Sequence, residues 1–308
     1  MTNFDLCVTI TIEKIFSHCA EKGDSMKLRQ SRPFGFALLL VVYLLASALG
    51  IFLYAISPFP YWLSFLVADV LATGFVYLFS SIFENASIYD PYWSLAPMVV
   101  VVALLPAHRI TLYGILLAVV VILWGVRLTA NFAYNFTSLE YQDWRYTMLE
   151  EKCGAFYPFV NLLGIHLVPT LVVYLCTLPV AYALEFSVEG NVLSYVALVL
   201  SVVGIALEGV ADVEMHIYRK TKTTPFIRQG LWKNARHPNY LGEILMWWGI
   251  GVSLLCATSL FWMPIGAIVN TALFLFISIP MAEKRQAKKE GFVEYKAKTR
   301  SLFPFPKK

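Results

Sequence analysis

The stretch ARHPNYLGE at residues 235–243 places a guanidinium, an imidazole, an amide, a phenol and a carboxylate directly before a long apolar run. Pro238 suits the first turn of a helix, where a backbone N–H is not needed, so we predict that a helix starts at residues 236–238. The unpaired N–H groups and the dipole of a helix start attract an anion, and Arg236 adds a full positive charge. The stretch therefore predicts an anion-binding site.

The loop that precedes this stretch is basic, and its cations are Arg219, Lys220, Lys222, Arg228 and Lys233. A basic loop at a membrane face also suits phospholipid head groups. Asn239 and Glu243 lie one helical turn apart on the same face. They argue against that alternative, because a head group does not need an amide and a carboxylate deeper in the helix.

Polar side chains recur every three or four residues on one face of two other expected helices, namely Arg127, Asn131 and Asn135, and then Glu208, Asp212, His216 and Arg219. An ionisable group at membrane depth costs about 2.5 to 3.5 kcal/mol unless it faces a wet, protein-lined interior. The three stripes therefore predict a hydrophilic cavity open to the cytosol. The alternative is that they satisfy one another in salt bridges, for example Arg127 with Glu208 or Asp212.

The composition indicates which elements must position these groups. Of the 308 residues, 58% are hydrophobic and 14% are charged, and several apolar runs reach the roughly 20 residues needed to cross a bilayer. We predict an all-α, polytopic integral membrane bundle of about eight transmembrane helices. The expected helices lie near residues 34–57, 60–83, 95–107, 111–135, 156–184, 191–217, 239–257 and 260–281.

Lysine and arginine cluster before the first expected span, after the sixth and after the last. The positive-inside rule places all three clusters in the cytoplasm, and this requires an even number of spans. The N- and C-termini are therefore expected in the cytoplasm, with Glu185 and Glu189 on the other side. Six spans with re-entrant segments remain an alternative.

Residues 1–33 are expected to form a cytoplasmic surface segment rather than a signal peptide, because Glu13 and Lys14 interrupt the apolar stretch. Residues 34–308 are expected to form a single transmembrane domain, with the cofactor cavity in residues 127–300. The five cysteines include no C-x-x-C pair, so we predict structural cysteines and no metal site. Asp69 and His166 are interpreted as structural hydrogen-bonding residues.

Several stretches resemble a known superfamily. GLWKNARHPNYLGEILMWWG, at residues 230–249, is similar to the C-terminal cofactor motif of the steroid 5-alpha-reductase and delta-14 sterol reductase superfamily, whose members carry similar RHPNYxGE/D stretches. PYWSLAP, RLTANFAY, YQDWRY and MAEKRQAKKEGFVEYKAKTRSLFPF resemble further signatures of an uncharacterised membrane branch. These blocks span about two thirds of the chain, residues 88–306.

The resemblance implies a reductase of carbon-carbon double bonds that binds NADPH in a cytosol-facing cavity. Carried over by position, the residues around the cofactor are Arg236, His237, Asn239, Tyr240 and Glu243, with Asp212 and Arg219 from a preceding D-x6-R spacing and Arg285 as a looser match. Arg127 and Asn131, from the facing polar stripe, complete the expected cofactor-binding set. The pyrophosphate suits the helix start, and the amides and riboses suit Asn, Asp and Glu.

The first half of the chain departs from this pattern. Steroid reductases place a Glu and a Tyr on early helices to polarise the substrate ketone, and no such pair aligns here. On chemistry alone, Tyr89, Asp90 and Trp93 are the catalytic candidates, because a proton donor beside aromatic rings suits the reduction of a flat, conjugated lipid. Their alternative role is an interfacial aromatic belt.

The resemblance further implies a lipid or steroid-like substrate, and we expect no nucleic-acid partner; the oligomeric state stays open. The main rival is an S-adenosylmethionine-dependent carboxyl methyltransferase of the isoprenylcysteine type. That family also has RHPxY, but it usually lacks the following Gly-Glu, here Gly242 and Glu243, and it has fewer spans. A non-enzymatic lipid-binding protein or carrier is the third class, although the chain lacks the repeats that carriers usually have.

Overall fold

The computed structural model describes residues 28–305. Most of the surface segment predicted for residues 1–33 lies outside the described residues, as do Cys7 and Cys19. The α-helices of the described part are α3 (Arg32–Ile56), α4 (Tyr61–Ile82), α5 (Tyr92–Leu104), α6 (Leu112–Asn135), α7 (Trp144–Cys153), α8 (Tyr157–Val160), α9 (Val168–Glu185), α10 (Val192–Thr221), α11 (Pro238–Thr258), α12 (Ile265–Leu273), α13 (Ile279–Gln286) and α14 (Phe292–Lys298).

Short helical segments extend these elements. They are 3₁₀ turns at Ala86–Tyr89, Leu105–Ala107, Gly154–Phe156 and Gly230–Lys233, and π-helical segments at Asn161–Leu167 and Phe274–Ser278. With them, eight helical stretches in the described part are long and apolar enough to cross a membrane. Large apolar side chains on the outer faces, such as Leu44, Phe52 and Val196, are 62%, 58% and 65% exposed. Such a surface suits lipid rather than water, and the predicted all-α polytopic bundle is confirmed.

The observed helical stretches differ from the expected spans at three places: the third, the last and the fifth, which runs from Trp144 to Glu185 rather than over residues 156–184. The third begins at Ala86 rather than at residue 95, because Asn85 caps a 3₁₀ turn and Pro91 then starts α5. The last runs from Ile265 to Gln286 instead of 260–281, since Pro264 is its N-cap. In addition, the expected loop after residue 135 contains α7, whose N-cap Asp143 accepts a hydrogen bond from the Arg145 N–H.

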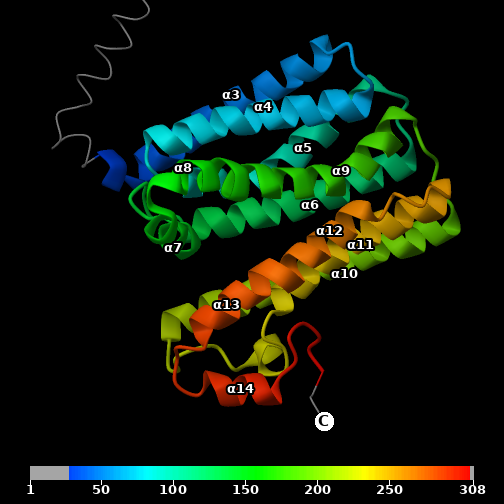
Figure 1. Cartoon of the computed structure of the whole chain (residues 1–308). Coiled ribbons are helices and arrows are strands. Elements are labelled where there is room, and N and C mark those ends of the chain that lie inside the picture. The colour runs from blue at the N-terminus through cyan, green and yellow to red at the C-terminus, as the bar shows by residue number, and fades with distance from the viewer. Residues whose placement is uncertain (1–27, 306–308) are drawn as a thin grey trace, which may run out of the picture.

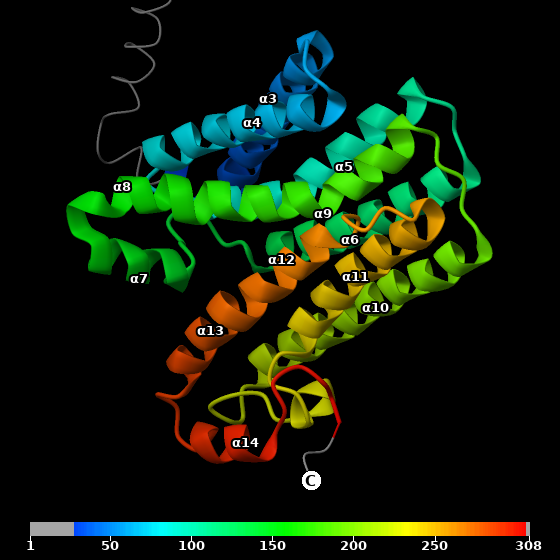
Figure 2. The ribbon, with the colours of Figure 1, turned by 45° about the vertical axis from the view of Figure 1, so that its right-hand side comes forward.

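The bundle has two ends. One, called here the basic end, carries residues 136–157, 222–237 and 287–305; the opposite end carries the loops 57–60, 108–111, 186–191 and 259–264. In both ribbon views α10, α11 and α12 lie beside α6 and α9 near the opposite end, and α10 and α13 diverge from α7 and α8 toward the basic end (Figures 1 and 2).

Glycines let α10 and α11 pack backbone against backbone. A Cβ on Gly242 would lie 2.6 Å from the Gly204 carbonyl oxygen and 2.6 Å from the Glu208 Cβ, which no real side chain tolerates. Gly249 packs in the same way on Ser201, whose hydroxyl donates to the Met246 carbonyl at 2.8 Å. This close approach brings the polar stripe of α10 against the first turns of α11.

Candidate functional site

The polar stripes of α6 and α10 face each other. The guanidinium of Arg127 lies 2.8 Å from Glu208 Oε2 and 2.7 Å from Asp212 Oδ2. These carboxylates and Arg127 are each at most 16% exposed. Arg127 therefore makes the interhelical ion pairs that were the alternative to an open polar cavity.

The stripe continues toward the basic end. Asn131 donates to Asp212 at 3.2 Å, Asn135 donates to Asn131 Oδ1 at 3.1 Å, and Arg219 donates to Asn135 at 2.8 Å. Asn135 and Arg219 are exposed, whereas Arg127 is nearly covered. The result is a hydrogen-bonded row that becomes accessible at its outer end.

Glu243 lies at the buried end of this row. Its side chain is almost wholly buried and accepts hydrogen bonds from the indole N–H groups of Trp124 at 2.7 Å and Trp247 at 2.8 Å. Its carboxyl group adjoins that of Glu208. The guanidinium of Arg127 thus pairs with the carboxylates of Glu208 and Asp212. The innermost carboxyl, that of Glu243, is instead hydrogen-bonded by two tryptophans.

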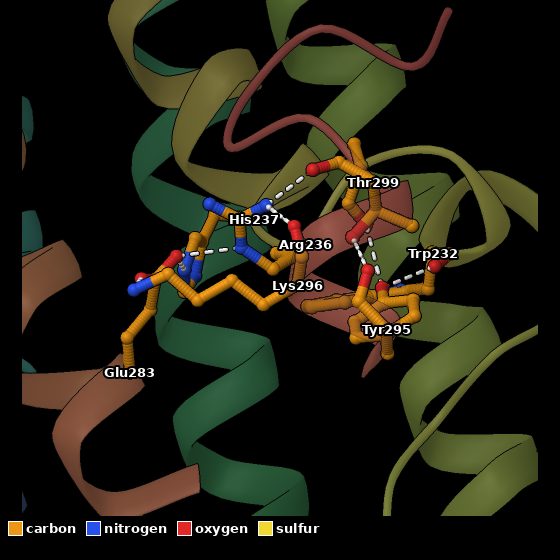
Figure 3. Close-up of polar contacts among 8 residues, drawn as sticks. Trp232, Arg236, His237, Glu283, Tyr295, Lys296 and Thr299 are labelled. Atoms are coloured by element: carbon orange, nitrogen blue, oxygen red, sulfur yellow. Dashed lines mark hydrogen bonds and ion pairs between the residues drawn. The ribbon is translucent and has the colours of Figure 1, made fainter. Parts of the chain in front are cut away.

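The helix start predicted from RHPNY is present, since α11 begins at Pro238. Arg236, however, does not face an open anion site. Its Nε donates to Glu283 at 2.6 Å, and its Nη1 donates to the carbonyls of Lys296 and Thr299 (Figure 3). The backbone N–H of Arg236 donates to the Arg300 carbonyl at 3.0 Å. A carboxylate and the C-terminal segment therefore occupy the place expected for an anion.

His237 lies beneath the same segment. Its N–H donates to the Ser301 carbonyl at 2.9 Å, and its ring stacks on Tyr240 with centroids 5.1 Å apart. Nε2 lies 3.4 Å from Glu283 Oε1, without the geometry of a hydrogen bond. Burial is the main reason why the pKa of His237 lies below its usual value; Glu283 opposes this shift, while Arg236 and Lys296 add to it.

Two further predicted residues, Asn239 and Tyr240, lie in the first turn of α11. Asn239 Oδ1 is buried and has no hydrogen-bond partner among residues 28–305. Tyr240 packs its ring on Phe274, with centroids 4.7 Å apart. A buried acceptor without a partner needs a water or a ligand. Asn239 is therefore the clearest sign, within the RHPNY stretch, of a polar ligand.

Arg285 lies across the gap between the two diverging groups of helices. Its guanidinium stacks over the Trp144 ring, 4.4 Å from the centroid, and so joins the end of α13 to the start of α7. Nearby Gln286 has a buried Oε1 without a partner in the described part of the chain. The structure thus brings Arg285, Asn239 and α7 to the basic end, where the outer part of the polar row also lies.

The three catalytic candidates lie around the start of α5. The Tyr89 hydroxyl is 2.8 Å from Thr170 Oγ1, and Asp90 accepts a 2.5 Å hydrogen bond from Tyr146. Trp93 packs its ring against Trp124, with centroids 5.9 Å apart. The interior location of Tyr89, which is 1% exposed, differs from that of an interfacial aromatic belt.

A separate cavity of about 410 Å³ lies between α3, α4, α5 and α9. Its wall is mostly apolar, and none of Tyr89, Asp90 and Trp93 lines it. Toward the middle of the bundle it ends on Asp69 and Tyr92, whose hydroxyl donates to Asp69 Oδ1 at 3.3 Å. The volume is within the range of small-molecule sites.

Sequence reasoning missed this carboxylate and phenol pair. The sequence favours a structural hydrogen-bonding role for Asp69, and its pattern singles out Tyr89 and Trp93 rather than Tyr92. The two are 23 residues apart, on the second and third spans, so periodicity within one helix does not connect them. The available signal was the chemistry of Asp69, which is the lone carboxylate in the apolar stretch FLVADVLATG.

Within residues 127–300, where a cofactor cavity was expected, a surface hollow of about 430 Å³ borders Arg236, Lys296, Thr299 and Arg300 and extends to Phe303. It is formed mostly by the C-terminal segment that contacts Arg236 and His237. The ammonium of Lys296 is 2.6 Å from Glu283, so two of the cations that border this hollow, Arg236 and Lys296, already share a carboxylate partner.

A family model described as "Protein of unknown function (DUF1295)" matches residues 76–299 of the chain. The match includes α5 to α14 and the RHPNY stretch, and it omits α3 and most of α4. No curated protein and no solved structure matches the chain.

Proposed function

The chain belongs to the DUF1295 family, and from its site we propose that it is a membrane-embedded reductase. It would use NADPH to reduce a carbon-carbon double bond in a lipid or steroid-like substrate. The observation that carries the proposal is the Asp69–Tyr92 pair at the inner end of an apolar cavity. The orientation proposed with it puts both termini and the basic end in the cytoplasm, where NADPH is found.

The floor of the cavity is suited to a conjugated carbonyl. The bond from the Tyr92 hydroxyl to Asp69 is long for an O–H···O bond at 3.3 Å, so the hydroxyl can turn toward a substrate oxygen. A donor at that oxygen stabilises the negative charge that develops there when hydride adds to the conjugated carbon. Asp69 and Tyr92 are therefore the proposed polarising pair.

The basic end offers groups that fit a dinucleotide. Asn239 Oδ1 is buried without a hydrogen bond in the described part, and an amide or hydroxyl group of a ligand would satisfy it. His237, whose Nε2 lies 3.4 Å from Glu283, is proposed to border the same site. Asn131, Asp212 and Arg219, at the accessible end of the polar row, and Arg285 are proposed to line the same site. When bound there, NADPH would supply the hydride.

Other residues of the expected cofactor-binding set are proposed to position helices and side chains rather than to contact the cofactor. Arg127 and Arg236 are held by carboxylates, so their part is to fix the helices rather than to bind phosphate. Tyr240 supports the ring of His237. Glu243 holds Trp124, which packs against Trp93, and Trp93 follows Tyr92 in α5. We propose that Trp93 joins the polar row to the cavity floor, where the hydride of a bound cofactor would have to reach the substrate.

The turn before α5 completes the proposal. Tyr89 packs its ring 5.8 Å from that of Tyr92, and Asp90 is held by the hydroxyl of Tyr146 on α7. These contacts link the catalytic candidates of the sequence to the cavity floor. Tyr89 and Asp90 are therefore proposed to position Tyr92.

The test measures cofactor binding and turnover of purified protein in lipid nanodiscs. We expect NADPH to bind with micromolar affinity that weakens with salt, and androst-4-en-3-one to serve as a conjugated test substrate. Tyr92→Phe should reduce turnover about a hundredfold and leave NADPH binding unchanged. Tyr113→Phe is the control, because its hydroxyl is also buried but bonds Ser253, away from the cavity.

Two results would overturn the proposal. One is binding of S-adenosylmethionine without any response to NADPH, which would favour the methyltransferase. The other is NADPH-dependent turnover that Tyr92→Phe and Tyr113→Phe leave equally intact.

A further inference from the structure

The cavity that ends on Asp69 and Tyr92 has a second polar region at its other end. Tyr54, Tyr61, His108 and Glu185 line it there, at the opposite end of the bundle. His108 Nε2 lies 3.0 Å from Glu185 Oε2, and the Tyr54 hydroxyl donates to the same oxygen at 3.5 Å. Since both contacts use Oε2, the second oxygen of Glu185 remains able to accept a hydrogen bond.

Between the two polar ends the cavity is long and apolar. Tyr61 and Asp69 are separated by about 12 Å along α4, and Tyr92 and Leu104 by about 18 Å along α5, at the helical rise per residue. Alanines and branched apolar side chains form the wall between these ends. A volume of about 410 Å³ stretched over such a length fits one narrow, extended molecule.

The polar residues at the Glu185 end of the cavity, called here the outer end of the cavity, are not needed to join the two loops at that end of the bundle. Arg109 pairs with Glu189 at 3.0 Å, and Thr111 donates to the Val188 carbonyl at 3.0 Å. Both contacts already tie the segment that follows α5 to the segment that follows α9. Of the two glutamates, only Glu185 lines the cavity.

We infer that the outer end is a specificity site, at which Glu185, held by His108 and Tyr54, accepts a hydrogen bond from a hydroxyl group of the ligand. The ligand is then an elongated, apolar molecule with a polar group at each end. A carboxylate discriminates strongly between a ligand that has the hydroxyl and one that lacks it, because hydrogen bonds to charged groups are stronger than neutral ones. The inference rests on the proposed function only for the carbonyl at the inner end.

The experiment compares two probes that share one ring system and differ only in the outer hydroxyl. Testosterone has it and androst-4-en-3-one lacks it. Equilibrium binding of each is measured to full-length protein in nanodiscs. We expect testosterone to bind about tenfold more tightly.

Glu185→Gln should reduce this preference to about threefold or less, while the affinity for androst-4-en-3-one stays unchanged. Glu189→Gln is the matched control, since it removes a carboxylate of the same end that does not line the cavity. It should keep the full preference. Tyr54→Phe removes one hydrogen bond to Glu185 but keeps its charge, so it should lower the preference less than Glu185→Gln does. This variant replaces Glu185→Gln in the test if Glu185→Gln does not fold.

The inference is wrong if wild-type protein binds neither probe or binds both equally, as expected of a cavity that only accommodates lipid chains. It is also wrong if Glu185→Gln weakens both probes alike, which a purely structural role would produce. NADPH binding, measured without either probe, tests the proposed function separately. A protein that binds NADPH but shows no preference would overturn this inference and leave the reductase proposal standing.

Discussion

At the scale of single residues, a cation in a membrane protein indicates a ligand site only when no carboxylate of the protein already neutralises it. Arg127 and Arg236 each carry a charge that suits phosphate, yet each contacts carboxylates at 2.6 to 2.8 Å. Asn239 and Gln286, two uncharged side chains at the basic end, each have a buried acceptor without a partner among the described residues. The polar atoms without partners, rather than the charges, therefore mark where a ligand would bind.

Two carboxylates of the polar row are predicted to behave differently when replaced. Asp212→Ala leaves Arg127 paired with Glu208, so the fold should persist while NADPH affinity falls by about 1 to 3 kcal/mol. Glu243→Gln leaves two indole donors facing a side chain with a single acceptor oxygen, so it should lower the free energy of unfolding by about 1 to 3 kcal/mol.

Thermal unfolding and NADPH titration of both variants check this difference. Glu294→Gln, on the exposed face of α14, is the control and should change neither quantity. If Asp212→Ala unfolds early but binds NADPH normally, the polar row is structural along its whole length.

His237 is predicted to make the protein less stable in acid. Burial lowers the pKa of folded His237, whereas the unfolded residue takes up a proton near pH 6.5. Between these values the unfolded state holds more protons, so stability is lost as the pH falls below about 6.5, by at most about 1.4 kcal/mol per pH unit for one proton. Unfolding temperatures of wild type and His237→Gln are compared from pH 7.5 to 5.

The variant should show a shallower loss over that range. The surrounding charges, Glu283, Arg236 and Lys296, are unchanged in it, so the difference between the two curves isolates His237. Parallel curves would show that His237 titrates alike in the folded and unfolded states.

At the scale of elements, the contact between α10 and α11 positions the polar row. Gly204 and Gly242 allow the two backbones to touch, and this close approach places Glu208 beside Glu243. The same arrangement leaves Trp247, one turn further along α11, to donate to Glu243. The glycine of the RHPNYLGE stretch therefore has a packing role that is distinct from that of the polar residues around it.

Gly242→Ala is predicted to destabilise the protein by about 1 to 3 kcal/mol, since its Cβ would lie 2.6 Å from both the Gly204 carbonyl oxygen and the Glu208 Cβ. Gly74→Ala is the matched control. Gly74 also lies in a helix, but nothing is within 4 Å of its added Cβ, so alanine should be neutral or slightly stabilising. Thermal unfolding of both variants in the same detergent measures the contrast, and equal unfolding temperatures would contradict the packing role.

At the scale of the whole molecule, the two ends of the bundle differ in chemistry. The basic end carries the polar row, Asn239 and the C-terminal segment, while the opposite end carries the outer polar group of the apolar cavity. The proposed reaction needs the basic end on the side of the membrane where NADPH is found, while an apolar substrate reaches the cavity.

Orientation is therefore predicted with the basic end in the cytoplasm. In a variant without native cysteines, Lys222→Cys should be protected from a membrane-impermeant thiol reagent in sealed right-side-out vesicles, and Glu189→Cys should react. Labels at the N-terminus and at Lys308 should be protected like Lys222. The reverse labelling pattern would place the RHPNY stretch away from cytosolic NADPH, and the reductase proposal would lose its cofactor.

The sequence alone determined the helical class, the number of spans and the start of α11 at Pro238, because each depends on local properties. Apolar length sets a span, and the missing N–H of proline suits a first turn. The i, i+4 spacing also indicated that Arg127 and Asp212 lie on polar faces. These parts of the candidate site were predictable since a helix repeats every few residues.

Only the tertiary structure decided which groups meet. The sequence places Arg236 at a helix start, but the carboxylate that neutralises it, Glu283, comes from α13, 47 residues later. Asp69 and Tyr92 likewise come from different spans and meet at a cavity floor. Such partners are chosen by how helices pack, through contacts such as Gly242 on Gly204, and no periodicity within one helix encodes them.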